Sequence, residues 1–151
     1  MDLKEFITIE QISAENNFNT KEEFFSKIAE LALKNGIITS EEEVIEGLKA
    51  REAKGSTGLL DGFAIPHAQT DSIKRAAVVI VKSLNKVEWE SLDEQPVGTA
   101  ICLLVPKSQA GTTHIDFLTE VSRLLMDDDF RNELNSLNDS NDIYNSLLKR
   151  L

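Results

Sequence analysis

Two stretches, residues 20–36 and 40–55, place apolar residues at the spacing of an amphipathic helix. Each begins with a hydroxyl residue followed three positions later by glutamate, the pattern of a capping box. These pairs are Thr20 with Glu23 and Ser40 with Glu43. The first stretch ends at Asn35-Gly36 and the second at Gly55, residues that favour helix ends. The inward faces consist of Phe24, Ile28, Leu31 and Ala32, and of Val44 and Leu48.

Two apolar runs rich in β-branched residues follow, "AAVVIVKS" from Ala76 and "VGTAICLLVP" from Val97. Continuous apolar runs of this length are typical of strands covered on both faces. Pro106 has no N–H to donate and marks the end of the second run. We expect three shorter strands as well, at Phe6–Ile9, at Phe63–Ile65 and at residues 86–91 around Trp89. The strand around Trp89 would be joined to the run from Ala76 by a turn near Asn85.

The helical period returns after Pro106. Thr113 is the expected cap of a helix whose apolar side includes Phe117, Leu118, Val121, Leu124 and Leu125. Two short amphipathic segments follow, one through Phe130 and Leu134, the other through Ile143, Leu147 and Leu151. The predicted fold is α/β, a small mixed β-sheet flanked by helices on both faces in a three-layer sandwich. Without repeats or a linker, residues 1–151 are expected to form a single domain.

Composition narrows the possible classes of function. With 41% hydrophobic residues, the chain can form a core without metals or crosslinks. Its single cysteine, Cys102, agrees with a reducing compartment, and neither a signal peptide nor a membrane-spanning run is visible, so we expect a cytoplasmic protein with no direct membrane insertion. The formal net charge of −10 makes nucleic acid an unfavourable partner.

His67 is one of only two histidines and follows Pro66 in the segment "GFAIPHAQTD". Proline fixes its own φ and biases the preceding Ile65 toward an extended conformation. We therefore expect His67 where a strand ends at a sheet edge and the chain turns away, with its imidazole held in one direction. A surface-loop histidine without a task is the alternative.

The second histidine, His114, is expected in the first turn of its helix and on the apolar side. A helix N-terminus favours anions and keeps an imidazole neutral. A satisfied core histidine is the other interpretation. Arg51 falls on the buried stripe of the second helix, where its fork of donors suits a phosphate or carboxylate. It could instead pair with Glu52 or extend into solvent.

Other chemistries find little support. Two histidines 47 positions apart form no metal-binding motif, and Cys102 lies inside an apolar strand. The sequence contains neither a Gly-x-Ser-x-Gly elbow nor a Gly-x-x-x-x-Gly-Lys phosphate loop. The polar turn Ser56-Thr57-Gly58 could add donors to an anion site.

The segment "LKAREAKGSTGLLDGFAIPHAQTD" resembles the signature of enzyme IIA domains of the bacterial phosphoenolpyruvate-dependent sugar phosphotransferase system, fructose/mannitol type. The hallmark is present as Arg51-Glu52, Ser56-Thr57-Gly58 and residues 62–68. The stretch "VEWESLDEQPV" and Thr113-His114 are similar as well, so the match covers nearly the whole chain. One departure is Glu94, which stands where glycine is common.

The resemblance implies a phosphoryl carrier, a phosphotransferase component with a phosphohistidine intermediate. His67 would accept a phosphoryl group from the phosphohistidine of the small protein HPr and pass it to an enzyme IIB domain. His114 and Arg51 would line the same site, with Glu52, Ser56 and Thr57 supporting it. No cofactor is implied.

A second interpretation is a regulatory, nitrogen-type enzyme IIA whose phosphorylation state controls partner binding. The tryptophan-containing stretch favours sugar transport. Fructose, mannitol, galactitol and related polyols all stay open, as do the oligomeric state and whether the chain is part of a larger permease, although Met1 at the start favours a complete protein.

Overall fold

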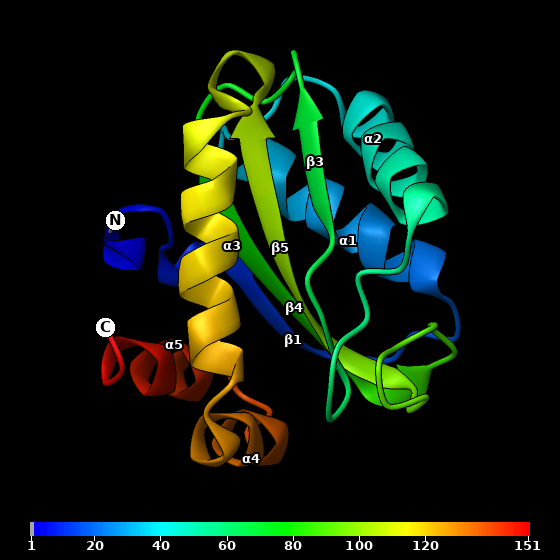
Figure 1. Ribbon diagram of the computed structural model, residues 1–151, viewed down its shortest axis with the longest axis vertical. Helices are drawn as coiled ribbons and strands as arrows, with labels where there is room; N and C mark the ends of the chain where they lie inside the picture. Colours follow the sequence, from blue (N-terminus) through cyan, green and yellow to red (C-terminus); the bar gives the residue numbers. More distant parts are fainter. Residues whose placement is uncertain (1) are drawn as a thin grey trace.

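A mixed five-stranded sheet forms the centre of the computed structural model, which describes residues 2–151 (Figure 1). The path of paired strands is β1-β4-β5-β2, and β3 also pairs with β5. β4 and β5 are antiparallel, and the other pairs are parallel. The strands are β1 (Ile12–Asn16), β2 (Phe63–Ala64), β3 (His67–Thr70), β4 (Ala77–Val87) and β5 (Val97–Pro106).

Helices cover both faces of this sheet. On one face lie α1 (Lys21–Lys34) and α2 (Glu41–Lys54), and on the other lie α3 (Thr112–Leu125), α4 (Asp128–Ser136) and α5 (Ser140–Leu148). Because side chains alternate along a strand, neighbouring residues such as Val79 and Ile80 enter different hydrophobic clusters, one on each face. The predicted α/β three-layer arrangement is confirmed. Within residues 2–151, no helix combines the length and apolarity needed to cross a bilayer.

The boundaries of α1 and α2 follow the caps that the sequence indicates. Thr20 and Glu23 form a complete capping box at α1. At α2, the Ser40 side chain accepts from the N–H of Glu43, but the Glu43 carboxylate accepts from the N–H of Ser72 instead of completing the box. Gly55 is the C-cap of α2, as expected.

Thr113 is not the cap of α3, so that prediction was wrong. The helix begins one residue earlier, at Thr112, and its N-cap is Gly111, which has no side chain to donate or accept. The three-residue 3₁₀ helix at Lys107–Gln109 leads the chain from β5 into α3.

Two of the expected short strands do not exist. In the segment Phe6–Ile9, the first three residues connect two 3₁₀ helices, Leu3–Glu5 and Ile9–Gln11, and Ile9 begins the second. The first strand begins only at Ile12. The apolar residues Leu3 and Ile7 are buried in the core without strand pairing. The sequence of β1, "ISAEN", is too polar to have been recognised as a strand.

The strand expected around Trp89 is also wrong. β4 continues through Asn85 to Val87, with a register shift after Lys82 instead of a turn. The Asn85 side chain donates to the carbonyl of Phe18, which explains a polar residue inside a strand. Trp89 follows the strand and packs edge-on against Phe24 and Phe25. Of the shorter predictions, only the strand at Phe63 is confirmed, over two residues.

Candidate functional site

His67 is the first residue of β3, which pairs with the C-terminal part of β5, from Leu103 to Pro106. We had expected it at the end of a strand before the chain turns away. In the structure, Ile65 and Pro66 interrupt the pairing after β2, and the chain then pairs with β5 again. Only 5% of the His67 surface is exposed, so it is not a surface-loop residue.

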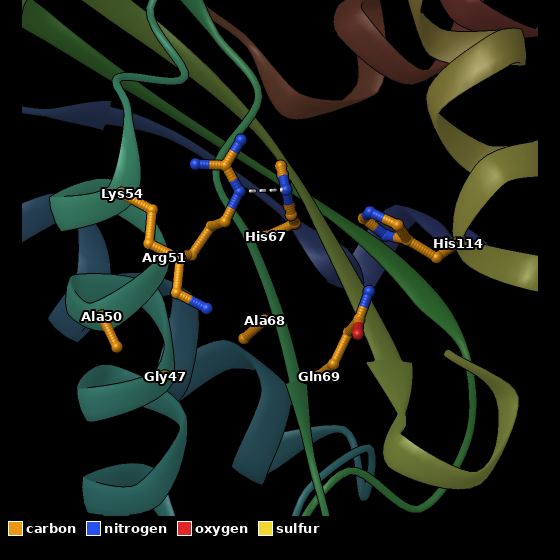
Figure 2. A pocket seen from close by; sticks show the side chains of 8 residues that line it. All are labelled: Gly47, Ala50, Arg51, Lys54, His67, Ala68, Gln69 and His114. Atoms are coloured by element: carbon orange, nitrogen blue, oxygen red, sulfur yellow. Dashed lines mark hydrogen bonds between the residues drawn. The ribbon is translucent and has the colours of Figure 1, made fainter. Parts of the chain in front are cut away.

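Two hydrogen bonds fix the tautomer of the His67 ring. Nδ1 lies 2.9 Å from the carbonyl oxygen of Ile65, and because a carbonyl only accepts, Nδ1 carries the proton. Nε2 therefore holds a lone pair, and it accepts a hydrogen bond of 2.8 Å from Nε of Arg51 (Figure 2). The nucleophilic nitrogen of this imidazole is Nε2.

Arg51 lies in the last turn of α2, and its guanidinium is held at two points. Besides the bond to His67, its Nη1 donates to the carbonyl of Gly55 over 2.7 Å. Among the described residues, no carboxylate lies within ion-pair distance of Arg51. The alternative pairing with Glu52 is therefore not formed, and the guanidinium keeps its charge available to an anion.

His114 reaches the same place from the opposite face of the sheet. It lies in the first turn of α3, and its ring centroid is 4.9 Å from that of His67, with a tilt of 50°. β3 lies at an edge of the sheet, so α2 and α3, which cover different faces, can both place a side chain beside His67 (Figure 2). His114 is half-buried, and within residues 2–151 its Nδ1 has no hydrogen-bond partner.

Both imidazoles are kept neutral. Burial is the main cause that lowers the pKa of His67 below 6.5, and the charge of Arg51 lowers it further, against the opposing hydrogen bond to Ile65. The pKa of His114 is also lowered, first by burial and then by the charge of Arg51. A neutral imidazole at neutral pH retains the lone pair that a nucleophile needs.

These side chains surround a cavity of about 270 Å³. Two further polar residues line this cavity, Lys54 and Gln69, which the sequence motifs did not indicate (Figure 2). Their spacing was a signal in the sequence. Lys54 is three positions after Arg51 on a helix, and Gln69 is two positions after His67 on a strand, so each shares a face with a candidate site residue. Its full lining consists of Gly47, Ala50, Arg51, Lys54, His67, Ala68, Gln69 and His114.

Glu52, Ser56 and Thr57 lie beside the cavity rather than in its lining. The Glu52 carboxylate accepts from the backbone N–H and the hydroxyl of Thr57, at 2.8 and 2.6 Å, and from Nε1 of Trp89 at 3.1 Å. The Ser56 hydroxyl donates to the carbonyl of Glu90. These bonds tie the loop after α2 to the segment that holds Trp89.

Gly58 explains why this loop needs a small residue. A Cβ at this position would lie 2.2 Å from the carbonyl oxygen of Glu90, well inside contact distance. The loop and the Glu90–Ser91 segment therefore pack backbone against backbone. This close approach explains why the Ser56-Thr57-Gly58 turn has glycine at its third position.

Other reactive groups in the described part of the chain are not arranged for chemistry. Residues 2–151 contain no group of three or more His, Cys, Asp or Glu side chains placed to hold a metal ion. Cys102 is fully buried in β5, and burial raises the pKa of its thiol far above the usual range. A buried neutral thiol is a poor nucleophile.

Comparison with known proteins identifies the family. The family model described as phosphoenolpyruvate-dependent sugar phosphotransferase system, EIIA 2, matches residues 5–150. A fructose-specific EIIA component of this system from Haloferax volcanii is 30% identical over 88% of this chain and 86% of its own length. A nitrogen regulatory protein from Bradyrhizobium diazoefficiens is 31% identical over 97% of this chain and 95% of its own.

Some relatives are much longer. The chain spans 18% of a fructose-specific EIIABC component from Mycoplasma pneumoniae, with 32% identity over 85% of this chain. It likewise spans 20% of a 2-O-α-mannosyl-D-glycerate-specific EIIABC component from Escherichia coli.

Solved structures agree with the sequence comparison. The nitrogen regulatory protein IIA-Ntr from Neisseria meningitidis superposes with a TM-score of 0.85 at 26% identity, over 95% of this chain and 97% of the other. Enzyme IIA for mannitol from Escherichia coli, in a complex with phosphorylated enzyme IIB, has the same fold, with a TM-score of 0.79 at 20% identity over 95% and 97%. The chain therefore belongs to the EIIA 2 family of the phosphoenolpyruvate-dependent sugar phosphotransferase system.

Proposed function

We propose that this chain carries a phosphoryl group on Nε2 of His67, accepting it from phospho-HPr and passing it to an enzyme IIB domain during sugar uptake. The observation that carries the proposal is the fixed tautomer of His67. Its proton is held on Nδ1 by Ile65, and its lone pair on Nε2 lies beside an arginine with no acidic partner among the described residues.

In the proposed step, the lone pair of Nε2 forms a bond to phosphorus while the N–P bond of the donor phosphohistidine breaks. The donor imidazole keeps the bonding electrons, and the proton on Nδ1 of His67 does not move. Arg51 has to release Nε2 and donate to phosphoryl oxygens instead. His114 adds a polar group on the side opposite Arg51. Such transfer depends mainly on positioning and on charge stabilisation.

Glu52, Ser56 and Thr57 support the site indirectly under this proposal. They fix the loop that follows α2, and the carbonyl of Gly55 in this loop accepts a hydrogen bond from Arg51. The direction of the guanidinium thus depends on the loop. We further propose that residues 1–151 act as one domain, in the cytoplasm, and without a cofactor.

The competing function is a regulatory one, and the comparisons supply a reason to test it. A nitrogen regulatory protein matches this chain over 97% of its length, and a fructose-specific component over 88%. The same phosphohistidine would then control binding to a target protein. Trp89 does not separate the two roles, because it is a core residue that holds Glu52. Fructose, mannitol and other polyols are all compatible with the transport role.

The experiment combines purified enzyme I, HPr and phosphoenolpyruvate with the wild-type chain, and measures the gain in mass of one acid-labile phosphoryl group. We expect His67→Ala to abolish the gain and His114→Ala to retain it at a lower rate. Candidate IIB domains then serve as acceptors. Transfer to a IIB domain supports transport, whereas stable phosphorylation with no transfer to any supports regulation. Labelling that persists in His67→Ala contradicts both.

A further inference from the structure

We propose that Lys54 and Gln69 bind non-bridging oxygens of the phosphoryl group on His67, on the sides that Arg51 does not cover. This inference rests on the proposed function. Both residues line the cavity beside His67 and reach it from different elements, Lys54 from α2 and Gln69 from β3 (Figure 2).

The backbone directs both side chains toward this cavity. Side chains two positions apart on a strand share a face, so Gln69 follows His67 along the same side of β3. Residues three apart on a helix are neighbours, so Lys54 lies beside Arg51 at the end of α2. The secondary structure therefore places Lys54 beside Arg51 and Gln69 on the same side as His67.

Both groups are free to bind a ligand. Within residues 2–151, neither the Lys54 ammonium nor the Gln69 amide has a hydrogen bond or ion pair with another side chain. By contrast, Lys49 on the same helix pairs with Glu46, and Arg51 is held by two bonds. The cavity thus contains two unused donor groups of different chemistry.

The charge of the cavity selects an anion. Its lining includes Arg51 and Lys54 but no carboxylate, in a chain with a formal net charge of −10. Glu52, the nearest acid in sequence, has both carboxylate oxygens occupied by Thr57 and Trp89. A cationic cavity without acids favours a phosphoryl dianion.

Three oxygens need donors from more than one direction. Arg51 approaches Nε2 from α2 and is tethered to Gly55, so it can cover only one side of a phosphoryl group. A volume of about 270 Å³ leaves room for the group between Arg51, Lys54 and Gln69. The amide of Gln69 and the ammonium of Lys54 complete the set of donors.

The expected size of the effect of each substitution depends on how exposed the side chain is. Lys54 is exposed, so losing its charge is expected to shift phosphoryl partitioning between HPr and this chain by about three- to fivefold toward HPr. Gln69 is partly buried and would donate to a charged oxygen, so Gln69→Leu is expected to shift it by about tenfold.

The experiment measures this equilibrium in mixtures with phospho-HPr for Lys54→Met, Gln69→Leu and Gln69→Glu. Lys49→Met is the matched control, because it removes the same charge from the same helix outside the cavity. We expect Lys49→Met and Lys54→Arg to match the wild type, and Gln69→Glu to be worse than Gln69→Leu because it adds repulsion. Equal partitioning in Lys54→Met, Gln69→Leu and wild type overturns the inference while His67 phosphorylation, and hence the proposed function, stands.

A second measurement does not need the transfer reaction. Inorganic phosphate is titrated into the unphosphorylated protein, and the side-chain amide signals of Gln69 are followed by NMR. We expect these signals to shift, and Lys54→Met to weaken the binding several-fold. If His67 takes no label but phosphate shifts Gln69, the carrier function fails and the anion site stands. If phosphate leaves Gln69 unchanged, the anion site fails.

Discussion

Replacing Arg51 by alanine separates a role in phosphoryl transfer from a role in folding. In the unphosphorylated protein, Arg51 makes two side-chain hydrogen bonds, one to Nε2 of His67 and one to the carbonyl of Gly55. A typical bond of this kind contributes about 1 kcal/mol. Because the side chain is partly exposed, we expect Arg51→Ala to lower the free energy of unfolding by only about 1 kcal/mol.

The effect on transfer is expected to be larger. Two charge-assisted hydrogen bonds from the guanidinium to phosphoryl oxygens contribute about 3 kcal/mol together. The variant gains back about 1 kcal/mol, since Nε2 of His67 no longer has to release a donor before it attacks. The net loss of about 2 kcal/mol corresponds to a rate of phosphorylation roughly 30-fold lower.

Quench-flow measurement of uptake from phospho-HPr gives this rate, and urea unfolding gives the stability. Arg51→Lys keeps the charge but not the fork of donors, so its rate is expected to lie between wild type and Arg51→Ala. Arg123→Ala, which removes an exposed arginine from the opposite end of α3, serves as the matched control. A stably folded Arg51→Ala that takes up and loses its phosphoryl group at wild-type rates would refute this role for Arg51.

Two further predictions concern pH and backbone strain. Since the folded pKa values of His67 and His114 lie below 6.5, the unfolded chain binds protons first as the pH falls below that value, and stability to urea should decrease there. His67→Gln should flatten this decrease, and an equally steep decrease would show that His67 does not cause it. Glu94 has a φ of 61°, in the left-handed region, so Glu94→Gly should stabilise the fold by about 0.5–1 kcal/mol in thermal unfolding. A lower melting temperature for Glu94→Gly would contradict this.

The sequence predicted the parts of the fold whose signals are local. Capping residues located α1 and α2, and continuous apolar runs located β4 and β5. β1 was missed because this polar edge strand, within residues 2–151, pairs only with β4, and no local pattern encodes such a pairing. The turn expected at Asn85 failed for a similar reason, because a distant carbonyl, that of Phe18, satisfies the asparagine side chain.

The candidate site shows the same limit. The motif and the periodicity indicated His67, Arg51 and His114, and the structure brings these three side chains together. The tautomer of His67 could not be predicted, since it depends on the position of the Ile65 carbonyl. Lys54 and Gln69 were missed because a spacing of three residues from Arg51 or two from His67 is a weak signal by itself, and only the cavity distinguishes these residues from other polar residues. Glu94 has a φ of 61°, in the left-handed region that glycine adopts most readily.

The position of the phosphoryl group on the imidazole shows whether Nε2 of His67 is the nucleophile. The protein, labelled with ¹⁵N at histidine, is phosphorylated by phosphoenolpyruvate, enzyme I and HPr, and its ring nitrogens are assigned by NMR. We expect an N–P bond at Nε2 of His67, with the proton still on Nδ1. A phosphoryl group on Nδ1 of His67, or on His114, would contradict it.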